Sequence, residues 1–198
     1  MRVLHGRIFG LAVLAGLAGC TPQGLDSSGA GAPAPLDYAD PGTRITLANQ
    51  VDGVASETEI TAAPPLGLQG AFTRADGSTG SFYPGCWGCG APNRIEEDLY
   101  AALWPLETGK QVTFLRTEGD GTQARVVIRV AGVERIETRA GRFDTYLLKG
   151  QISNITGARW SAQVDAWWAP EPGWVVKAEG SDSAGRSLLS EAVTILAP

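Results

Sequence analysis

Histidine is almost absent from this sequence, in which His5 is the only one among 198 residues. It lies in a segment where the basic residues Arg2 and Arg7 precede an apolar run of about ten residues, too short to span a bilayer. This arrangement is typical of a signal peptide, so we expect residues 1–19, and His5 with them, to be removed. The mature chain then has no histidine for Ser–His–Asp or Cys–His catalysis, for an HExxH zinc site or for haem attachment.

Positive charge is also scarce. The chain has 16 Lys and Arg residues against 21 Asp and Glu, and the expected signal contains two of the basic residues and no acid. The mature chain would have 14 basic and 21 acidic residues, a net charge of −7. We therefore expect no nucleic-acid partner and no attraction to anionic headgroups.

The motif LAGC, residues 17–20, directly follows the apolar run and resembles the lipobox of bacterial lipoproteins. The resemblance implies that Cys20 becomes the first residue of the mature chain and carries acyl chains such as palmitate. Thr21 rather than aspartate follows it, which in Gram-negative bacteria implies transfer to the outer membrane. We expect a lipid-anchored outer-membrane protein whose domain faces the periplasm, because several acyl chains together anchor a protein stably. An ordinary secretory signal with a chance cysteine is the alternative.

Composition divides the rest of the chain in two. Residues 20–42 are rich in Gly, Ala, Pro and Ser, and we interpret them as a flexible tether. Residues 43–198 are long enough to form a proper hydrophobic core and contain no internal repeat and no second run of membrane-spanning length. We expect them to form a single domain without a cofactor or a metal.

Alternation of apolar and polar residues predicts a mainly β fold for this domain. It is clearest in QARVVIRV (123–130) and RWSAQVDAWW (159–168). With the intervening turn signals, the pattern predicts an antiparallel meander that forms a curved sheet or half-open barrel. The expected strands are 43–48, 57–62, 68–74, 79–83, 111–118, 123–138, 142–152, 158–169, 174–181 and 186–196. One short helix is expected near 94–103, with Asn93 as its N-cap and Glu96 at the capping-box position.

Three phrases occur in a familiar order: WPLETGK (104–110), TRAGRFDT (138–145) and WWAPEPGWVVK (167–177). Together they resemble an uncharacterised group of Gram-negative envelope proteins that have WPL..GK, AG.FDT and WYAPE.G.VVK at corresponding places. This chain departs from the group at Trp168, where tyrosine is usual. The resemblance implies an antiparallel sheet and no particular activity.

Aromatic residues gather in the second half of the domain. Alternation places Trp167 and Trp168 on opposite faces of one strand, so one of them must contact a second layer, a ligand, a partner or solvent. Phe143 and Trp160 are further candidates for a core or for the lining of a cavity. We interpret these four aromatic residues, with Trp87, as candidate contacts for a ligand or a partner.

Cys86 and Cys89 belong to the stretch YPGCWGCGAP (83–92). Export would place them in an oxidising compartment, where we expect a disulfide. Gly90 stands where haem attachment needs a histidine. With Cys20 lipidated, the mature chain has no further cysteine or histidine for a zinc site, which only a dimer sharing two cysteine pairs could complete. A structural disulfide that fixes Trp87 is the favoured interpretation, and a thioredoxin-like redox site is the alternative.

We therefore expect a non-enzymatic role, in which one face of the sheet binds an apolar ligand or an envelope protein. The first alternative is a thiol–disulfide redox protein that uses Cys86 and Cys89. The second is a pure interaction module that presents Trp87 and Trp167 to another protein.

Overall fold

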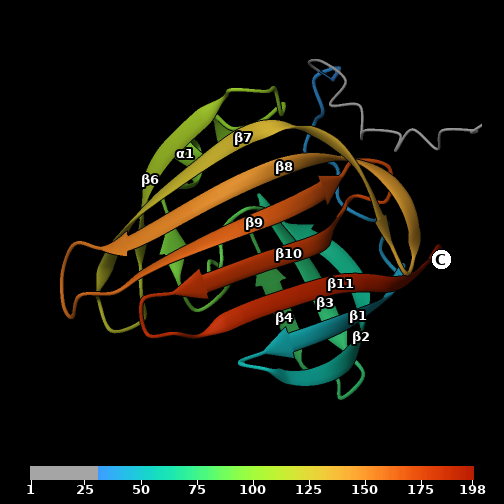
Figure 1. The fold of residues 1–198 in the computed structure, drawn as a ribbon, viewed down its shortest axis with the longest axis horizontal. Helices are drawn as coiled ribbons and strands as arrows, with labels where there is room; N and C mark the ends of the chain where they lie inside the picture. Colours follow the sequence, from blue (N-terminus) through green and yellow to red (C-terminus); the bar gives the residue numbers. More distant parts are fainter. Residues whose placement is uncertain (1–30) are drawn as a thin grey trace, which may run out of the picture.

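The computed structural model describes residues 31–198. The expected signal peptide, Cys20 and the first part of the expected tether lie outside these residues. The described chain forms one antiparallel sheet of eleven strands and one short helix (Figure 1). The strands are β1 (Arg44–Val51), β2 (Val54–Leu66), β3 (Gln69–Arg74), β4 (Thr79–Phe82), β5 (Arg94–Ile95), β6 (Gln111–Thr117), β7 (Gln123–Thr138), β8 (Gly141–Asn154), β9 (Ser161–Ala169), β10 (Trp174–Asp182) and β11 (Ser187–Leu196), and the helix is α1 (Glu97–Ala101).

The strand order is β4-β3-β2-β1-β11-β10-β9-β8-β7-β6-β5, so β4 and β5 are the two edges of an open sheet. The sheet bends far enough to bring β4 over β10, although β3, β2, β1 and β11 lie between them. The ring centroid of Phe82 in β4 is 4.6 Å from that of Trp174 in β10. The predicted mainly β, antiparallel architecture is confirmed, in its open-sheet form.

The main core lies on the inner face of β6 to β9. In β7 the even-numbered residues from Ala124 to Val130 are buried, and their odd-numbered neighbours are exposed or half-buried. β9 follows the same rule from Ala162 to Trp168. The alternation seen in the sequence therefore corresponds to a sheet with one buried and one more exposed face.

The helix is confirmed, but it is shorter than expected. Arg94 and Ile95 pair with β6 instead of starting the helix, and the N-cap is Glu96, which makes no side-chain capping hydrogen bond. The Asn93 side chain donates to the carbonyl oxygen of Gly88. Glu96 instead accepts a hydrogen bond from the backbone N–H of Leu115 in β6. The predicted capping box is therefore wrong, because the Glu96 side chain bonds to β6 and the Asn93 side chain bonds to Gly88. No helix in residues 31–198 has the length and apolarity needed to cross a membrane.

The last part of the expected tether packs onto the sheet. Ala34 and Ala39 are buried, and Ala34 forms a β-bridge with Leu106. The Tyr38 ring contacts Trp168 and Phe82 edge-on, at centroid distances of 5.5 and 5.8 Å. Residues 34–39 therefore pack onto the sheet, although they precede the expected boundary at residue 43. A composition rich in small residues did not distinguish a tether from a closely packed extended segment.

Residues 83–93, called here the crossing segment, connect one edge of the sheet to the other by running over its inner face. The crossing is closest at Gly150 of β8, where a Cβ atom would lie 2.1 Å from the carbonyl oxygen of Gly85. Only glycine leaves room for backbone at that distance. The inner face is therefore filled by the chain itself.

The β7–β8 hairpin extends beyond the end of β9 as an arm, residues 132–145. The pairing of β7 with β8 is irregular between Val130 and Gly132, where the arm begins. Its tip reaches β11, where the backbone N–H of Ala140 donates to the carbonyl oxygen of Ala192 at 3.1 Å. Figure 1 shows the arm bending past the ends of β9 and β10.

Candidate binding site

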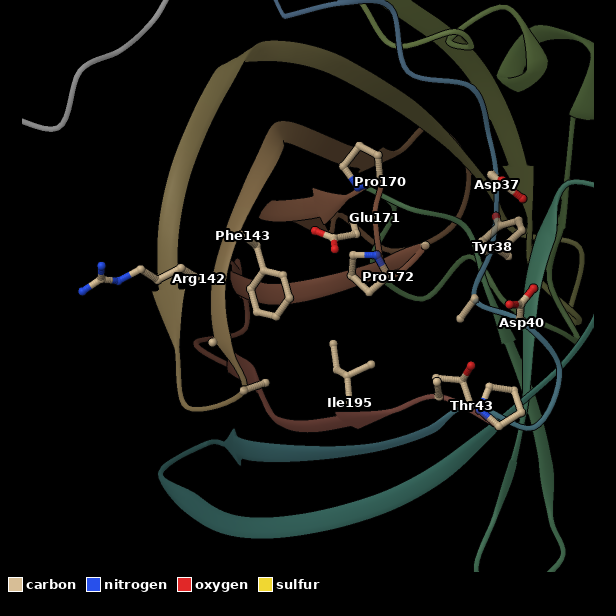
Figure 2. Close-up of a pocket in the computed structure, with 16 residues that line it drawn as sticks. Asp37, Tyr38, Asp40, Thr43, Arg142, Phe143, Pro170, Glu171, Pro172 and Ile195 are labelled. Carbon is tan, nitrogen blue, oxygen red and sulfur yellow. The ribbon is translucent and has the colours of Figure 1, made fainter.

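A pocket of about 490 Å³ lies where the arm tip meets the end of the sheet (Figure 2). It is enclosed by four segments: residues 37–43, the arm tip 140–143, the β9–β10 turn 170–173 and residues 195–198. Its volume is within the roughly 300–1,000 Å³ typical of small-ligand sites.

One wall of the pocket depends on Gly173. The backbone N–H of Ala39 donates to the carbonyl oxygen of Gly173 at 3.0 Å. A Cβ atom on Gly173 would lie 2.4 Å from the Ala39 nitrogen, and φ of Gly173 is +61°. Glycine is therefore required here, both for the close approach and for the left-handed backbone.

The lining combines apolar side chains with carboxylates. The Phe143 ring and the Ile195 side chain point into the pocket between Pro172 and the arm (Figure 2). The carboxylate-bearing residues of the lining are Asp37, Asp40 and Glu171. Arg142 also belongs to the lining, but its guanidinium points away and pairs with Glu137 at 3.3 Å.

Of the residues selected from the sequence, Phe143 alone lines this pocket. Trp168 is fully buried in the main core, edge-on to Trp104 at 5.6 Å. Trp167 is half-buried on the other face and packs with Ile136 and Phe143 in a separate small cluster. Its indole N–H donates to Glu134, and Lys177 lies 4.8 Å above its ring. The second layer that covers Trp167 is therefore the arm of the same chain.

Trp160 and Trp87 do not line the pocket. Both are half-buried and pack against the main core on the inner face of the sheet. The indole N–H of Trp160 donates to Asp182 at 2.9 Å, and its ring lies 5.7 Å from the guanidinium carbon of Arg116. Arg116 is buried, pairs with Glu118 and donates to the carbonyl oxygen of Trp87 at 2.9 Å. Arg116 therefore links Trp160 to the crossing segment, to which Trp87 belongs.

Two ionisable groups in these contacts have shifted pKa values. Burial of the Asp182 carboxylate opposes its ionisation, but hydrogen bonds from Trp160, Arg186 and Ala184 lower its pKa to about 2. Burial raises the pKa of Tyr38, whose hydroxyl donates to the carbonyl oxygen of Leu68 at 2.8 Å. Asp182 is therefore held as a carboxylate and Tyr38 as a neutral phenol, as structural contacts require.

Cys86 and Cys89 form a disulfide within the crossing segment. Both residues are buried, at 8% and 1% exposure. Helix α1 begins at Glu97, beyond the intervening β5, so no helix starts at the disulfide as one does at a thioredoxin-like site. Within residues 31–198, no group of three His, Cys, Asp or Glu side chains is arranged to hold a metal ion.

Most of the pocket could not be read from the sequence. Asp37, Tyr38 and Asp40 belong to the expected tether, and Glu171, to which no binding role was assigned, belongs to the phrase at residues 167–177. The one available signal was Tyr38, a large aromatic residue in an otherwise small and polar segment.

The fold is similar to those of several solved structures. One of them is the hypothetical lipoprotein YmcC from Escherichia coli. Its alignment covers 82% of this chain and 90% of the YmcC chain, with a TM-score of 0.50 and 12% sequence identity. A Bacteroides fragilis protein with a YmcC-like fold covers 82% of this chain and 99% of its own, with a TM-score of 0.46 and 15% identity. A candidate lipoprotein from Parabacteroides distasonis covers 83% of this chain and 100% of its own, with a TM-score of 0.45 and 10% identity. No family model and no curated protein matches the chain. In its fold, the chain is therefore similar to YmcC.

Proposed function

We propose that this chain is a lipoprotein of the bacterial outer membrane whose periplasmic domain binds a small ligand without converting it chemically. The observation that carries the binding role is the pocket of about 490 Å³ enclosed by four separate segments. Most small-molecule sites are concave, largely pre-formed and lined by apolar and aromatic side chains with a few polar groups. This pocket shares the concave shape and the combination of apolar and polar side chains around Phe143 and Glu171, although polar groups form the larger part of its lining.

The position of the pocket refines the expectation that one sheet face binds an apolar ligand. The inner face is occupied by the crossing segment and by residues 34–39, and part of the opposite face is covered by the arm. The pocket at the arm tip is open to ligand, so we assign the binding role to it. Phe143 is the member of the predicted set that would contact the ligand.

The anchor is proposed from the LAGC motif at residues 17–20. The resemblance in fold to the hypothetical lipoprotein YmcC supports this assignment. Acylation at Cys20 would hold the domain at the membrane surface, because several acyl chains bind a bilayer far more durably than one.

Redox catalysis by Cys86 and Cys89 is not favoured. A reactive cysteine needs access and a stabilised thiolate, and both cysteines are buried in the crossing segment. The interaction module that presents Trp87 and Trp167 is not favoured either. Trp167 is occupied by Glu134, Lys177 and the arm, and the Trp87 ring lies over Gly180.

The anchor is tested with the full chain expressed in a Gram-negative host. Wild-type protein should incorporate a labelled palmitate analogue and sediment with outer membranes. Cys20→Ser should incorporate no label, keep its signal peptide and be absent from the outer-membrane fraction, because cleavage before residue 20 follows acylation of the cysteine. Equal labelling and sedimentation of the two proteins would contradict the lipid anchor.

The binding role is tested with N-phenyl-1-naphthylamine, a neutral aromatic probe that fluoresces in apolar surroundings. Solubilised wild-type protein should bind one probe, and Ala197→Trp should abolish binding by filling the pocket. Leu196→Trp is the matched control, because the neighbouring residue is exposed and does not line the pocket. Absence of probe binding, or equal binding by the two variants, would overturn the assignment.

A further inference from the structure

The charges around the pocket are strongly unbalanced. Asp37, Asp40 and Glu171 make no ion pair with another residue of the described chain. The only cation of the lining, Arg142, faces outward and is engaged by Glu137. The lining therefore includes three carboxylates without a compensating cation, all on exposed residues, with Asp37 and Asp40 at the rim. A cleft that carries charge of one sign attracts ions of the opposite sign.

The apolar part of the lining lies close to these charges. Figure 2 shows the Phe143 ring and the Glu171 carboxylate both projecting into the pocket, with Ile195 and Pro172 beside them. A cation over an aromatic face is attracted by the ring, and the attraction increases when the cation is partly desolvated. The pocket thus offers a carboxylate, an aromatic face and aliphatic surface to one ligand.

We propose that the pocket binds a small cationic amphiphile, a free organic molecule that joins an ammonium or guanidinium group to a short apolar chain. This inference rests on the proposed binding role and specifies the class of ligand. The cation lies between Glu171 and the Phe143 ring, and the apolar chain lies against Ile195 and Pro172. Asp37 and Asp40 attract the cation from the pocket rim.

A bare metal ion does not fit this lining. Hard divalent cations take six or more oxygen ligands at about 2.0–2.6 Å, which requires carboxylates gathered at one point. The pocket carboxylates do not form such a group, and no metal-binding cluster occurs among residues 31–198. Dispersed negative charge around an apolar centre instead suits a bulky organic cation.

The test measures displacement of N-phenyl-1-naphthylamine by three ligands with the same chain: hexylammonium, hexanol and hexanoate. Hexylammonium should compete about tenfold better than hexanol, because partly screened ion pairs contribute on the order of one factor of ten. Hexanoate should compete less well than hexanol. Raising the salt concentration from low to molar should abolish the preference for hexylammonium.

Variants that replace the pocket carboxylates with amides test whether the preference for hexylammonium arises from the pocket. The triple variant Asp37→Asn, Asp40→Asn, Glu171→Gln should lose the preference for hexylammonium over hexanol. This preference is a ratio of two competitors, so it is measured independently of how tightly the variant binds the probe. The matched control is Glu59→Gln, Asp98→Asn, Glu107→Gln, which removes the same charge from residues outside the pocket. The control should keep the preference.

The outcomes separate this inference from the binding role itself. If the probe binds and hexanol or hexanoate competes as well as hexylammonium, the charge inference is wrong and the binding role stands. The same conclusion follows if the control variant loses the preference as fully as the triple variant does. If the probe itself does not bind, the binding role and the charge inference both fail.

Discussion

Asp182 is the residue on which most side-chain contacts of the β10–β11 hairpin converge. One carboxylate oxygen accepts hydrogen bonds from the backbone N–H groups of Ala184 and Arg186. The other accepts from the Arg186 guanidinium and the Trp160 indole. The side chain of Asp182 has no exposed surface. A single carboxylate therefore shapes the turn and fixes Trp160 from the neighbouring loop.

The lowered pKa of Asp182 predicts a pH dependence of stability. Its pKa is about 2 in the folded protein against 3.8 for a free carboxyl, so the unfolded state binds the proton more readily. The stabilisation is complete above about pH 4 and is lost as the pH falls from 4 to 2. Urea unfolding from pH 7 to 2 should show Asp182→Asn less stable at neutral pH and the difference shrinking below pH 4. Asp98→Asn should follow the wild type, and a constant difference at all pH values would contradict this role.

The neighbours Trp167 and Trp168 show what the sequence reveals at the residue scale. Alternation places them on opposite faces, and the structure confirms this with one in the main core and the other in a separate cluster. What covers Trp167 was not predictable, because the arm that reaches it comes from β7 and β8. Local periodicity reports which side of a strand a residue faces and not what lies on that side.

At the scale of elements, the crossing segment has no regular structure, yet it determines what the inner face contains. Its backbone passes over Gly150, and its Trp87 ring lies over Gly180. The Arg116 side chain, from β6, donates a hydrogen bond to the Trp87 carbonyl oxygen of the crossing segment. The disulfide between Cys86 and Cys89 stiffens the part of the segment between these contacts.

Removing the disulfide should lower stability without changing the fold. Closing so short a loop is worth about 2 kcal/mol in the chain-entropy model. Cys86→Ala, Cys89→Ala should therefore lose about 2 kcal/mol of unfolding free energy in urea and keep the wild-type β-sheet circular dichroism. Wild-type protein under reducing conditions is the matched control and should show a similar loss. Unfolding of the variant without denaturant would contradict a local role for the disulfide.

The long strands were predictable, and the elements set by distant partners were not. β7 alternates regularly over residues 123–130 and β9 over residues 161–168, and this alternation identifies both strands directly. β5 has only two residues and is defined by its pairing with β6. The expected helix start was wrong for the same reason, since tertiary pairing overrode a weak local preference.

At the scale of the whole molecule, Tyr38 connects parts that lie far apart in the sheet. Its ring contacts Phe82 of the edge strand β4 and Trp168 of β9, and its hydroxyl binds the loop between β2 and β3. Residues 34–39 therefore pack between the edge strand β4 and the main core.

Tyr38→Ala should be strongly destabilising for a residue outside every strand. Removing a large aromatic side chain from a core lowers the free energy of unfolding by about 3 kcal/mol or more, and the loss is smaller where the side chain is half-buried. Urea unfolding should show a loss of about 2 kcal/mol or more. The neighbouring exposed variant Asp37→Ala is the control and should stay within about 0.5 kcal/mol of wild type. Equal stability of the two variants would show that residues 34–40 act as a tether.

The pairing of β1 with β11 has a consequence for the order in which the protein is made. β11 leaves the ribosome last, yet it lies between β1 and β10 and joins the first four strands to all the others. Before β11 is synthesised, both of these neighbours have an unpaired edge, the kind of edge at which chains aggregate. A chain that stops before Ser187 would therefore form two separate sheets with open edges and not a smaller version of the domain.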